Sequence, residues 1–233
     1  MPQELSIYRT LSDLTGWQLV PYGHIIGAAL VLLIITTSSF IAWQYWKDPY
    51  KAMLPTPGFS FSHLYEVITE MILNLLESIV GKDANLYLPL IGSLFIYILL
   101  CNLMGIIPGF DPPTSNINTN LPCALIVFFY YNYVGMKKYG VLSYFRKMAG
   151  PVLWLAPLIF TNELISHLVR PVSLSVRLFG NMMGDHITLT MFSDFVPILV
   201  PTIFMLLGLL IGIIQAFVFC ILTMIYISLA KEH

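Results

Sequence analysis

Apolar residues fill five long runs of the chain, and polar residues gather in the segments between them. The runs cover residues 25–46, 86–108, 119–136, 151–192 and 195–230. A membrane-spanning helix needs about 20 consecutive, mostly apolar residues, so each run is long enough to cross a bilayer. The pattern predicts an all-α polytopic membrane protein in which five membrane-crossing helices form one membrane domain over residues 1–233.

The segment between the first two runs has a different pattern. Over residues 60–81 the apolar positions recur at helical spacing. The opposite face carries His63, Glu66, Glu70, Asn74 and Glu77. This pattern predicts an amphipathic helix on the cytoplasmic membrane surface. Helices that bind anionic lipid usually carry a basic polar face, whereas this face is acidic, so a solvated face and docking to a partner subunit both stay open.

Lysine and arginine indicate the orientation, because short cytoplasmic loops carry an excess of both. Four basic residues follow the third run with no acid among them: Lys137, Lys138, Arg146 and Lys147. We therefore expect this segment to be cytoplasmic. The loop after the second run and the loop near Asp194 lack basic residues and are expected outside. An external N-terminus (residues 1–24) and a cytoplasmic C-terminus satisfy every loop.

The last two runs are longer than an ordinary span. At 1.5 Å per residue the fourth run would reach ~63 Å and the fifth ~54 Å as helices, whereas the hydrocarbon layer is ~30 Å thick. Common tilts of about 20° do not absorb this difference. Either these segments are broken, as Pro171 would permit, or they are steeply inclined. We favour two long, steeply tilted helices that form a hairpin.

Polar residues of the fourth run fall on one line along its helix. The line consists of Glu163, His167, Arg170, Leu174, Arg177, Asn181 and Asp185, at intervals of three or four residues. Ionisable residues at membrane depth are rare and mark ion or proton pathways. Arg177 has no acid three or four positions away, which makes it the strongest candidate. Arg170 either pairs with Glu163 or extends to the interface.

Several further positions bear on the chemistry. His186 lies more than 90° off this polar line, but with Asp185 it could line an outer aqueous inlet. His167 and His186 lack a convergent third ligand, so no metal site is expected. In the fifth run Gly208, Gly212 and Gln215 share one face. Glycines four residues apart permit close helix approach, and Gln215 would be a neighbour of Arg177.

Composition excludes several classes of protein. Hydrophobic residues make up 58% of the chain and charged residues 10%, whereas a soluble domain carries about 25% charged residues. The three cysteines lie in apolar runs without metal-ligand spacing. The chain lacks a G-x-x-x-x-G-K-[ST] motif and any nucleophile–base constellation. We therefore expect no catalysis by this chain alone, no cofactor and no nucleic-acid partner.

Several motifs resemble one protein family. They are RPVSLSVRLFGNM around Arg177, the preceding NELISHLVRP, NLMGIIPG at 102–109, PTSNINTNL at 113–121, and IQAFVF in the last run. Together these motifs resemble the a subunit of the membrane sector of F-type ATP synthase. By this resemblance Arg177 corresponds to the essential stator arginine and Asn181 to its downstream asparagine. Likewise, Gln215 corresponds to the glutamine of the last helix and Glu163 to the acid on the cytoplasmic side.

The chain departs from that family at one place. Many relatives have a carboxylate at the position of His186, or pair a histidine there with an acid seven residues before the glutamine. In this chain that second position is Gly208. Asp185, which directly precedes His186, is the candidate replacement for the missing carboxylate.

The resemblance implies a non-catalytic, proton-translocating stator subunit in the lipid bilayer of the bacterial inner membrane. Its implied partners are a c-subunit ring, b-type peripheral stalk subunits and the rest of the ATP synthase. Two half-channels would load and unload the ring carboxylates and so couple proton flow to rotation and ATP synthesis. We assign the outer one to Asn181, Asp185, His186 and Gln215. We assign the cytoplasmic one to Glu163, Ser166, His167 and Arg170, with Arg177 separating the two.

Two other classes of function compete with this interpretation. A secondary transporter binds its substrate between internal repeats, and we find no repeat here. A self-contained proton channel needs its whole path within one chain, yet the polar line lacks a partner acid for Arg177. The choice of proton or sodium and the ring size belong mainly to the rotor rather than to this chain.

Overall fold

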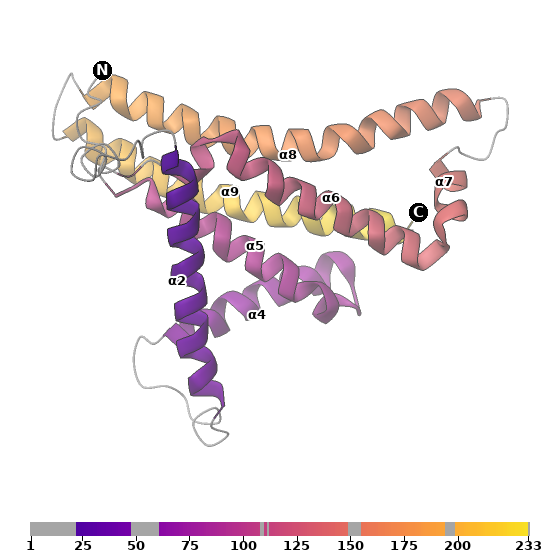
Figure 1. Cartoon of the computed structure of the whole chain (residues 1–233), viewed down its shortest axis with the longest axis horizontal. Coiled ribbons are helices and arrows are strands. Elements are labelled where there is room, and N and C mark those ends of the chain that lie inside the picture. Colours follow the sequence, from indigo (N-terminus) through magenta and orange to yellow (C-terminus); the bar gives the residue numbers. More distant parts are fainter. Residues whose placement is uncertain are drawn as a thin grey trace. The chain divides into compact units, whose positions relative to one another are not determined.

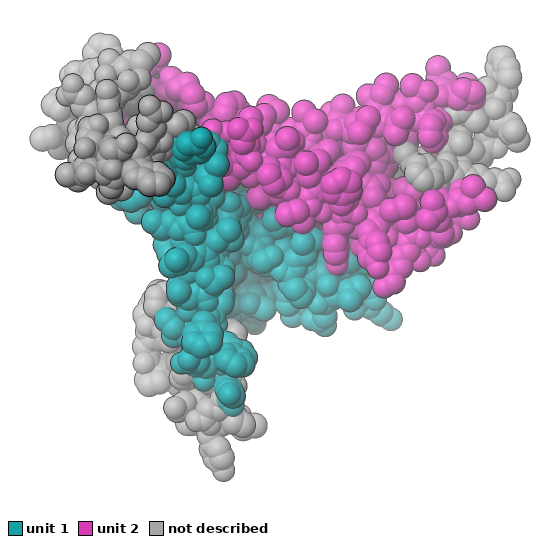
Figure 2. Space-filling model, viewed as in Figure 1, with its two compact units in different colours: residues 1–113 teal, residues 114–233 magenta. Residues whose placement is uncertain are grey.

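The computed structural model describes residues 22–47, 61–107, 110, 112–148, 155–193 and 199–232. Within these residues every regular element is helical, with seven α-helices and one short 3-10 turn, Pro113–Ser115. The predicted all-α class is therefore confirmed. The chain divides into two compact units, residues 1–113 and 114–233, shown in teal and magenta in Figure 2.

Unit 1 contains the helices α2 (Gly23–Trp46), α4 (Phe61–Val80) and α5 (Ala84–Met104), which pack on one another (Figure 1). Val31 of α2 forms a buried core with Cys101 and Met104 of α5. Two serine hydroxyls of α2, at positions 38 and 39, lie 2.8 and 3.1 Å from the Tyr65 hydroxyl of α4. These hydrogen bonds satisfy polar groups among apolar helices, where a group without a partner is costly.

Helix α4 has the two faces that its sequence pattern predicts. Ile72 and Leu76 are buried against unit 1. The opposite face is exposed and carries His63, Glu66, Glu70, Asn74 and Glu77. The helix ends at Gly81, whose φ of 82° is in the left-handed region that glycine adopts without a Cβ penalty. The location of α4 at a membrane surface stays a prediction.

Unit 2 contains α6 (Ile117–Tyr139), α7 (Val141–Met148), α8 (Ala156–Ser193) and α9 (Leu199–Glu232). The long helices α6, α8 and α9 pack on one another (Figure 1). The short helix α7 was not among the elements expected from the sequence. It begins after Gly140, which ends α6 at a φ of 81°. Tyr144 of α7 packs onto Gly135 of α6, where a Cβ would stand 2.6 Å from its ring.

Helices α8 and α9 run antiparallel along each other. Phe192 stacks on Phe204 with ring centroids 5.3 Å apart, and the Arg170 guanidinium lies 5.4 Å from the centre of the Tyr226 ring. Residue numbers along α9 therefore increase in the direction in which those along α8 decrease. The helix α8 continues through Pro171 without interruption, although its axis bends near the middle (Figure 1).

The lengths of these two helices fit the sequence argument. Helix α8 has 38 residues and α9 has 34, so they reach about 57 and 51 Å, well beyond a hydrocarbon layer of ~30 Å. Their steep tilt in a bilayer stays a prediction. Parts of the expected elements, residues 1–21, 60, 108, 151–154 and 195–198, lie outside the described residues, as does Asp194.

Three of the described helices are long and apolar enough to cross a membrane. They cover Gly23–Gln44, Ala84–Met104 and Pro201–Lys231 and correspond to the first, second and fifth apolar runs. The chain is accordingly a polytopic helical membrane protein. Helices α6 and α8 carry more polar side chains, so the third and fourth crossings, and with them the total of five, stay predictions.

Candidate functional site

The predicted polar line follows one flank of the buried face of α8. The buried face consists of His167, Pro171, Leu174, Ser175, Leu178 and Met182. The polar line overlaps this face at His167 and Leu174, and at 100° per residue its centre lies roughly a sixth of a turn to one side. Its other side chains therefore lie at the edge between the packed interior of unit 2 and its outer surface. This position lets them contact both α9 and a molecule beside α8.

Arg177 is exposed on the surface of unit 2. Its neighbours three and four positions away on α8 are Ser173, Leu174, Gly180 and Asn181, none of which is charged. Of the ion pairs found among the described residues, none involves Arg177. A guanidinium is always charged, and a charge at membrane depth is costly without a partner. An anion from outside this chain would therefore be strongly attracted to Arg177.

One turn further along, Asn181 connects α8 to α9. Its Nδ2 donates to Oε1 of Gln215 at 2.7 Å. Gln215 is buried, and its own Nε2 has no hydrogen-bond acceptor among the described residues. A buried N–H without an acceptor costs about 1–3 kcal/mol. The Gln215 side chain thus faces α8, as expected, and presents a donor that a water molecule or another acceptor would satisfy.

Asp185 lies against α9 at Gly208. A Cβ added to Gly208 would collide with Oδ2 of Asp185 and stand 3.1 Å from its Cγ. The carboxylate of Asp185 therefore occupies the space that a side chain at position 208 would take. His186 is half-buried on the other flank of α8. The structure brings Asn181, Asp185 and Gln215 to the α8–α9 contact.

The other end of the polar line forms a cluster. Oε1 of Glu163 lies 3.4 Å from Nε2 of His167 and 3.6 Å from Nη2 of Arg170. Of the two interpretations of Arg170, the structure thus favours pairing with Glu163. Ser166 is half-buried in the same turn. The Arg170 guanidinium also lies over two aromatic rings, 5.9 Å from the centre of Tyr131 and 5.4 Å from that of Tyr226.

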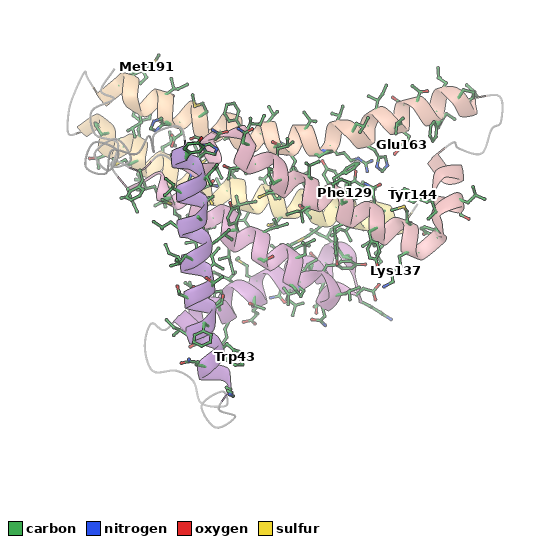
Figure 3. All side chains as sticks on the ribbon, viewed as in Figure 1. Trp43, Phe129, Lys137, Tyr144, Glu163 and Met191 are labelled. Carbon is green, nitrogen blue, oxygen red and sulfur yellow. The ribbon has the colours of Figure 1, made fainter. Side chains whose placement is uncertain are left out.

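Three tyrosines in this cluster, Tyr131, Tyr144 and Tyr226, were not among the site residues expected from the sequence. The hydroxyl of Tyr131 lies 3.2 Å from Nδ1 of His167, and the edge of the Tyr144 ring faces the same imidazole. Glu163 and Tyr144 lie at the same end of unit 2 (Figure 3). Burial is the largest cause that raises the pKa of Tyr144; Arg170 opposes it. Of the three, Tyr226 alone had a sequence signal, because it shares the face of Gln215.

The described residues contain no group of three or more metal-ligating side chains. The polar chemistry along α8 is that of charged groups, amides and an imidazole. It comprises an exposed guanidinium in the middle of α8, an amide pair and a carboxylate towards one end, and a histidine–carboxylate cluster towards the other.

Comparisons with known proteins identify the family. A family model described as "ATP synthase A chain" matches residues 25–228. ATP synthase subunit a of Bdellovibrio bacteriovorus is 43% identical over 182 residues, which cover 78% of this chain and 80% of the relative. The subunit a of Geobacter sulfurreducens is 47% identical over 185 residues, again 78% and 80%. That of Trichlorobacter lovleyi is 48% identical over 170 residues, or 72% and 74%. This chain belongs to the ATP synthase A chain family.

Proposed function

We propose that this chain is the stator subunit of the membrane sector of an ATP synthase. It conducts protons to and from carboxylates on a rotating ring of c subunits, and in this way couples proton flow to rotation and ATP synthesis. It performs no chemical catalysis itself. Family membership supports this role, and one observation carries it within the structure, the exposed Arg177 without an ion-pair partner among the described residues.

The physical basis is the cost of charge in lipid. A ring carboxylate that faces lipid must be protonated, because the ionised form would lose its hydration without compensation. Beside the guanidinium of Arg177 the same group can ionise, because the cation stabilises the anion. A ring subunit that covers the exposed Arg177 would exclude water from the contact, which strengthens this attraction. Each carboxylate must therefore release its proton on arriving at Arg177 and take up another on leaving.

The outer half-channel is assigned to Asn181, Asp185, His186 and Gln215. The donor of Gln215 without an acceptor and the hydrogen bond from Asn181 supply polar groups for water between α8 and α9. Asp185 at Gly208 supplies the carboxylate on this path. This geometry supports Asp185 as the group that stands in for the acid missing at position 208, with His186 beside it in sequence but on another flank.

The cytoplasmic half-channel is assigned to Glu163, Ser166, His167 and Arg170. Their ion pairs bring a carboxylate and an imidazole within 3.4 Å of each other, which suits proton transfer between them. Arg177 lies between the two half-channels along α8. Because it stays protonated and cannot pass a proton on, it blocks a direct leak. The membrane potential then contributes ~2.3 kcal/mol per charge per 100 mV to rotation.

The assembly follows from the same role. The partners would be the c-subunit ring beside Arg177, b-type peripheral stalk subunits and the rest of the ATP synthase, in a bacterial inner membrane with the N-terminus outside and the C-terminus in the cytoplasm. The acidic face of α4 offers a surface for a stalk subunit with basic residues. The coupling ion is taken to be the proton.

The test uses the complete enzyme reconstituted into proteoliposomes. Arg177→Ala is expected to abolish ATP synthesis driven by a proton gradient, because a ring carboxylate then has no cation beside which to ionise. Lys137→Ala, which removes an exposed cation at the end of α6, should leave synthesis unchanged. Coupled synthesis at the wild-type rate in Arg177→Ala would refute the proposal, as would failure of this chain to co-purify with a c ring.

A further inference from the structure

The hydroxyl of Tyr131 connects α6 to the assigned cytoplasmic half-channel. Tyr131 is 1% exposed and His167 is 8% exposed, so their 3.2 Å contact is shielded from water. Burying two polar groups is costly unless each finds a partner. The contact therefore contributes to the position of the imidazole, and it joins residues that are far apart in the chain.

The two ring nitrogens of His167 have different partners. Nδ1 faces the Tyr131 hydroxyl, and Nε2 faces the Glu163 carboxylate. When His167 is neutral with its proton on Nδ1, that N–H donates to the tyrosine oxygen, and Nε2 can take up a proton from Glu163. When Nε2 carries this proton, its N–H donates to the Glu163 carboxylate and the N–H of Nδ1 still donates to Tyr131. The hydroxyl oxygen therefore serves His167 in either protonation state.

Charged and titratable groups from every helix of unit 2 surround this pair. Arg170 on α8 places a fixed positive charge 3.6 Å from Glu163. The ring of Tyr144 on α7 meets the imidazole edge-on. The Arg170 guanidinium lies 5.4 Å from the centre of the Tyr226 ring on α9 and 5.9 Å from the centre of the Tyr131 ring on α6. Cation–π contacts of this kind, each worth roughly 0.5–2 kcal/mol, hold the guanidinium beside the carboxylate.

We infer that Tyr131 is a positioning residue of the cytoplasmic half-channel: it holds His167 and Arg170 so that His167 and Glu163 together take up and release one proton. This inference rests on the proposed function. One proton is added to an imidazole nitrogen on loading and one leaves through Glu163 on release, so only N–H and O–H bonds change. A phenol has an ordinary pKa near 10, so Tyr131 acts through its hydrogen bond rather than by ionising.

The exposed fractions of the side chains in this cluster indicate which residue exchanges protons with water. Tyr131 and His167 are buried, whereas the Arg170 and Glu163 side chains are 20% and 31% exposed. Glu163 is therefore the member of the cluster that exchanges protons with water. His167 is the buried member, which needs a fixed partner on the side away from water. Tyr131 supplies that partner.

The experiment measures ATP-driven proton pumping by the complete enzyme, in vesicles with the catalytic head outward, over a range of external pH. In this direction protons enter through the cytoplasmic half-channel. Tyr131→Phe keeps the ring under Arg170 and removes the hydroxyl. Loss of this hydrogen bond destabilises the protonated imidazole more than the neutral one, because hydrogen bonds to charged groups are stronger. The external pH of half-maximal pumping should fall by about one unit.

Matched variants separate the possible results. Tyr133→Phe on the same helix removes an exposed hydroxyl and should leave the profile unchanged. His167→Gln removes the other member of the same hydrogen-bonded pair. The double variant with Tyr131→Phe should therefore have the same pH of half-maximal pumping as His167→Gln alone. A wild-type profile in Tyr131→Phe, or in His167→Gln, would overturn the inference. If Arg177→Ala abolishes pumping in the same preparation, the proposed function stands even when the inference fails.

Discussion

Gly208→Ala is the substitution that tests the assigned outer half-channel most directly. The added methyl group would stand 3.1 Å from Cγ and 3.4 Å from Oδ1 of Asp185, with Oδ2 nearer still. Carbon atoms in contact are about 3.5–4.0 Å apart. The Cγ atom must therefore retreat by about half an ångström and Oδ2 by more, which moves the carboxylate away from α9.

The expected effect on stability is small and the effect on function is large. Overpacking costs about 1–3 kcal/mol, but here the end of a side chain can rotate away, and alanine gains about 1 kcal/mol over glycine in a helix. The free energy of unfolding should thus change by about 1 kcal/mol or less. A misplacement of about 1 Å can lower a rate by up to ~100-fold. Uptake from outside should fall by roughly 10- to 100-fold.

The assay is ATP synthesis by reconstituted enzyme, driven by an imposed proton gradient and measured against the pH of the vesicle lumen, which corresponds to the outside of the cell. The control is Gly92→Ala in α5, where an added methyl group meets no atom within 4 Å. A second variant combines Gly208→Asp with Asp185→Gly and moves the carboxylate across the contact. It should recover part of the rate that Asp185→Gly alone loses.

Two results would refute this reasoning. If Gly208→Ala and Asp185→Asn both keep wild-type synthesis at every lumen pH, the carboxylate at this contact carries no protons. If Gly208→Ala slows synthesis equally at every lumen pH and also lowers the amount of assembled enzyme, the methyl group acts through packing and not through the inlet.

Two further substitutions test contacts within unit 2. Asn181→Ala leaves the buried Oε1 of Gln215 without its donor, so the free energy of unfolding should fall by about 1–3 kcal/mol. Thermal denaturation of the complex in detergent should show a lower unfolding temperature. An unchanged temperature would mean that water already replaces the amide. Gly135→Ala places a methyl group 2.6 Å from Cε2 of Tyr144. It should displace α7 and speed limited proteolysis there, whereas Gly180→Ala, with no atom within 4 Å, should not.

Local patterns in the sequence determined the helical class and much of the site. Apolar runs and helical spacing depend on residues within one element, so α2, α5 and the two faces of α4 follow directly from them. The polar line on α8 has the same origin, because 3.6 residues per turn place positions three and four apart on one face. Arg177 stood out for this reason, without any knowledge of its neighbours in space.

The tertiary structure decided which helix meets which, and at what height. Tyr131 contacts His167 from α6, and Asp185 fills the space beside Gly208 from α8. Each contact depends on how far one packed helix is shifted and rotated against another, and on the shapes of the side chains between them. The residues of one helix alone do not determine these quantities. The short helix α7 was missed, and its packing on α6 depends on the space that Gly135 leaves for the Tyr144 ring. Helix periodicity is a local property of the chain, whereas the register between helices arises only when their surfaces pack.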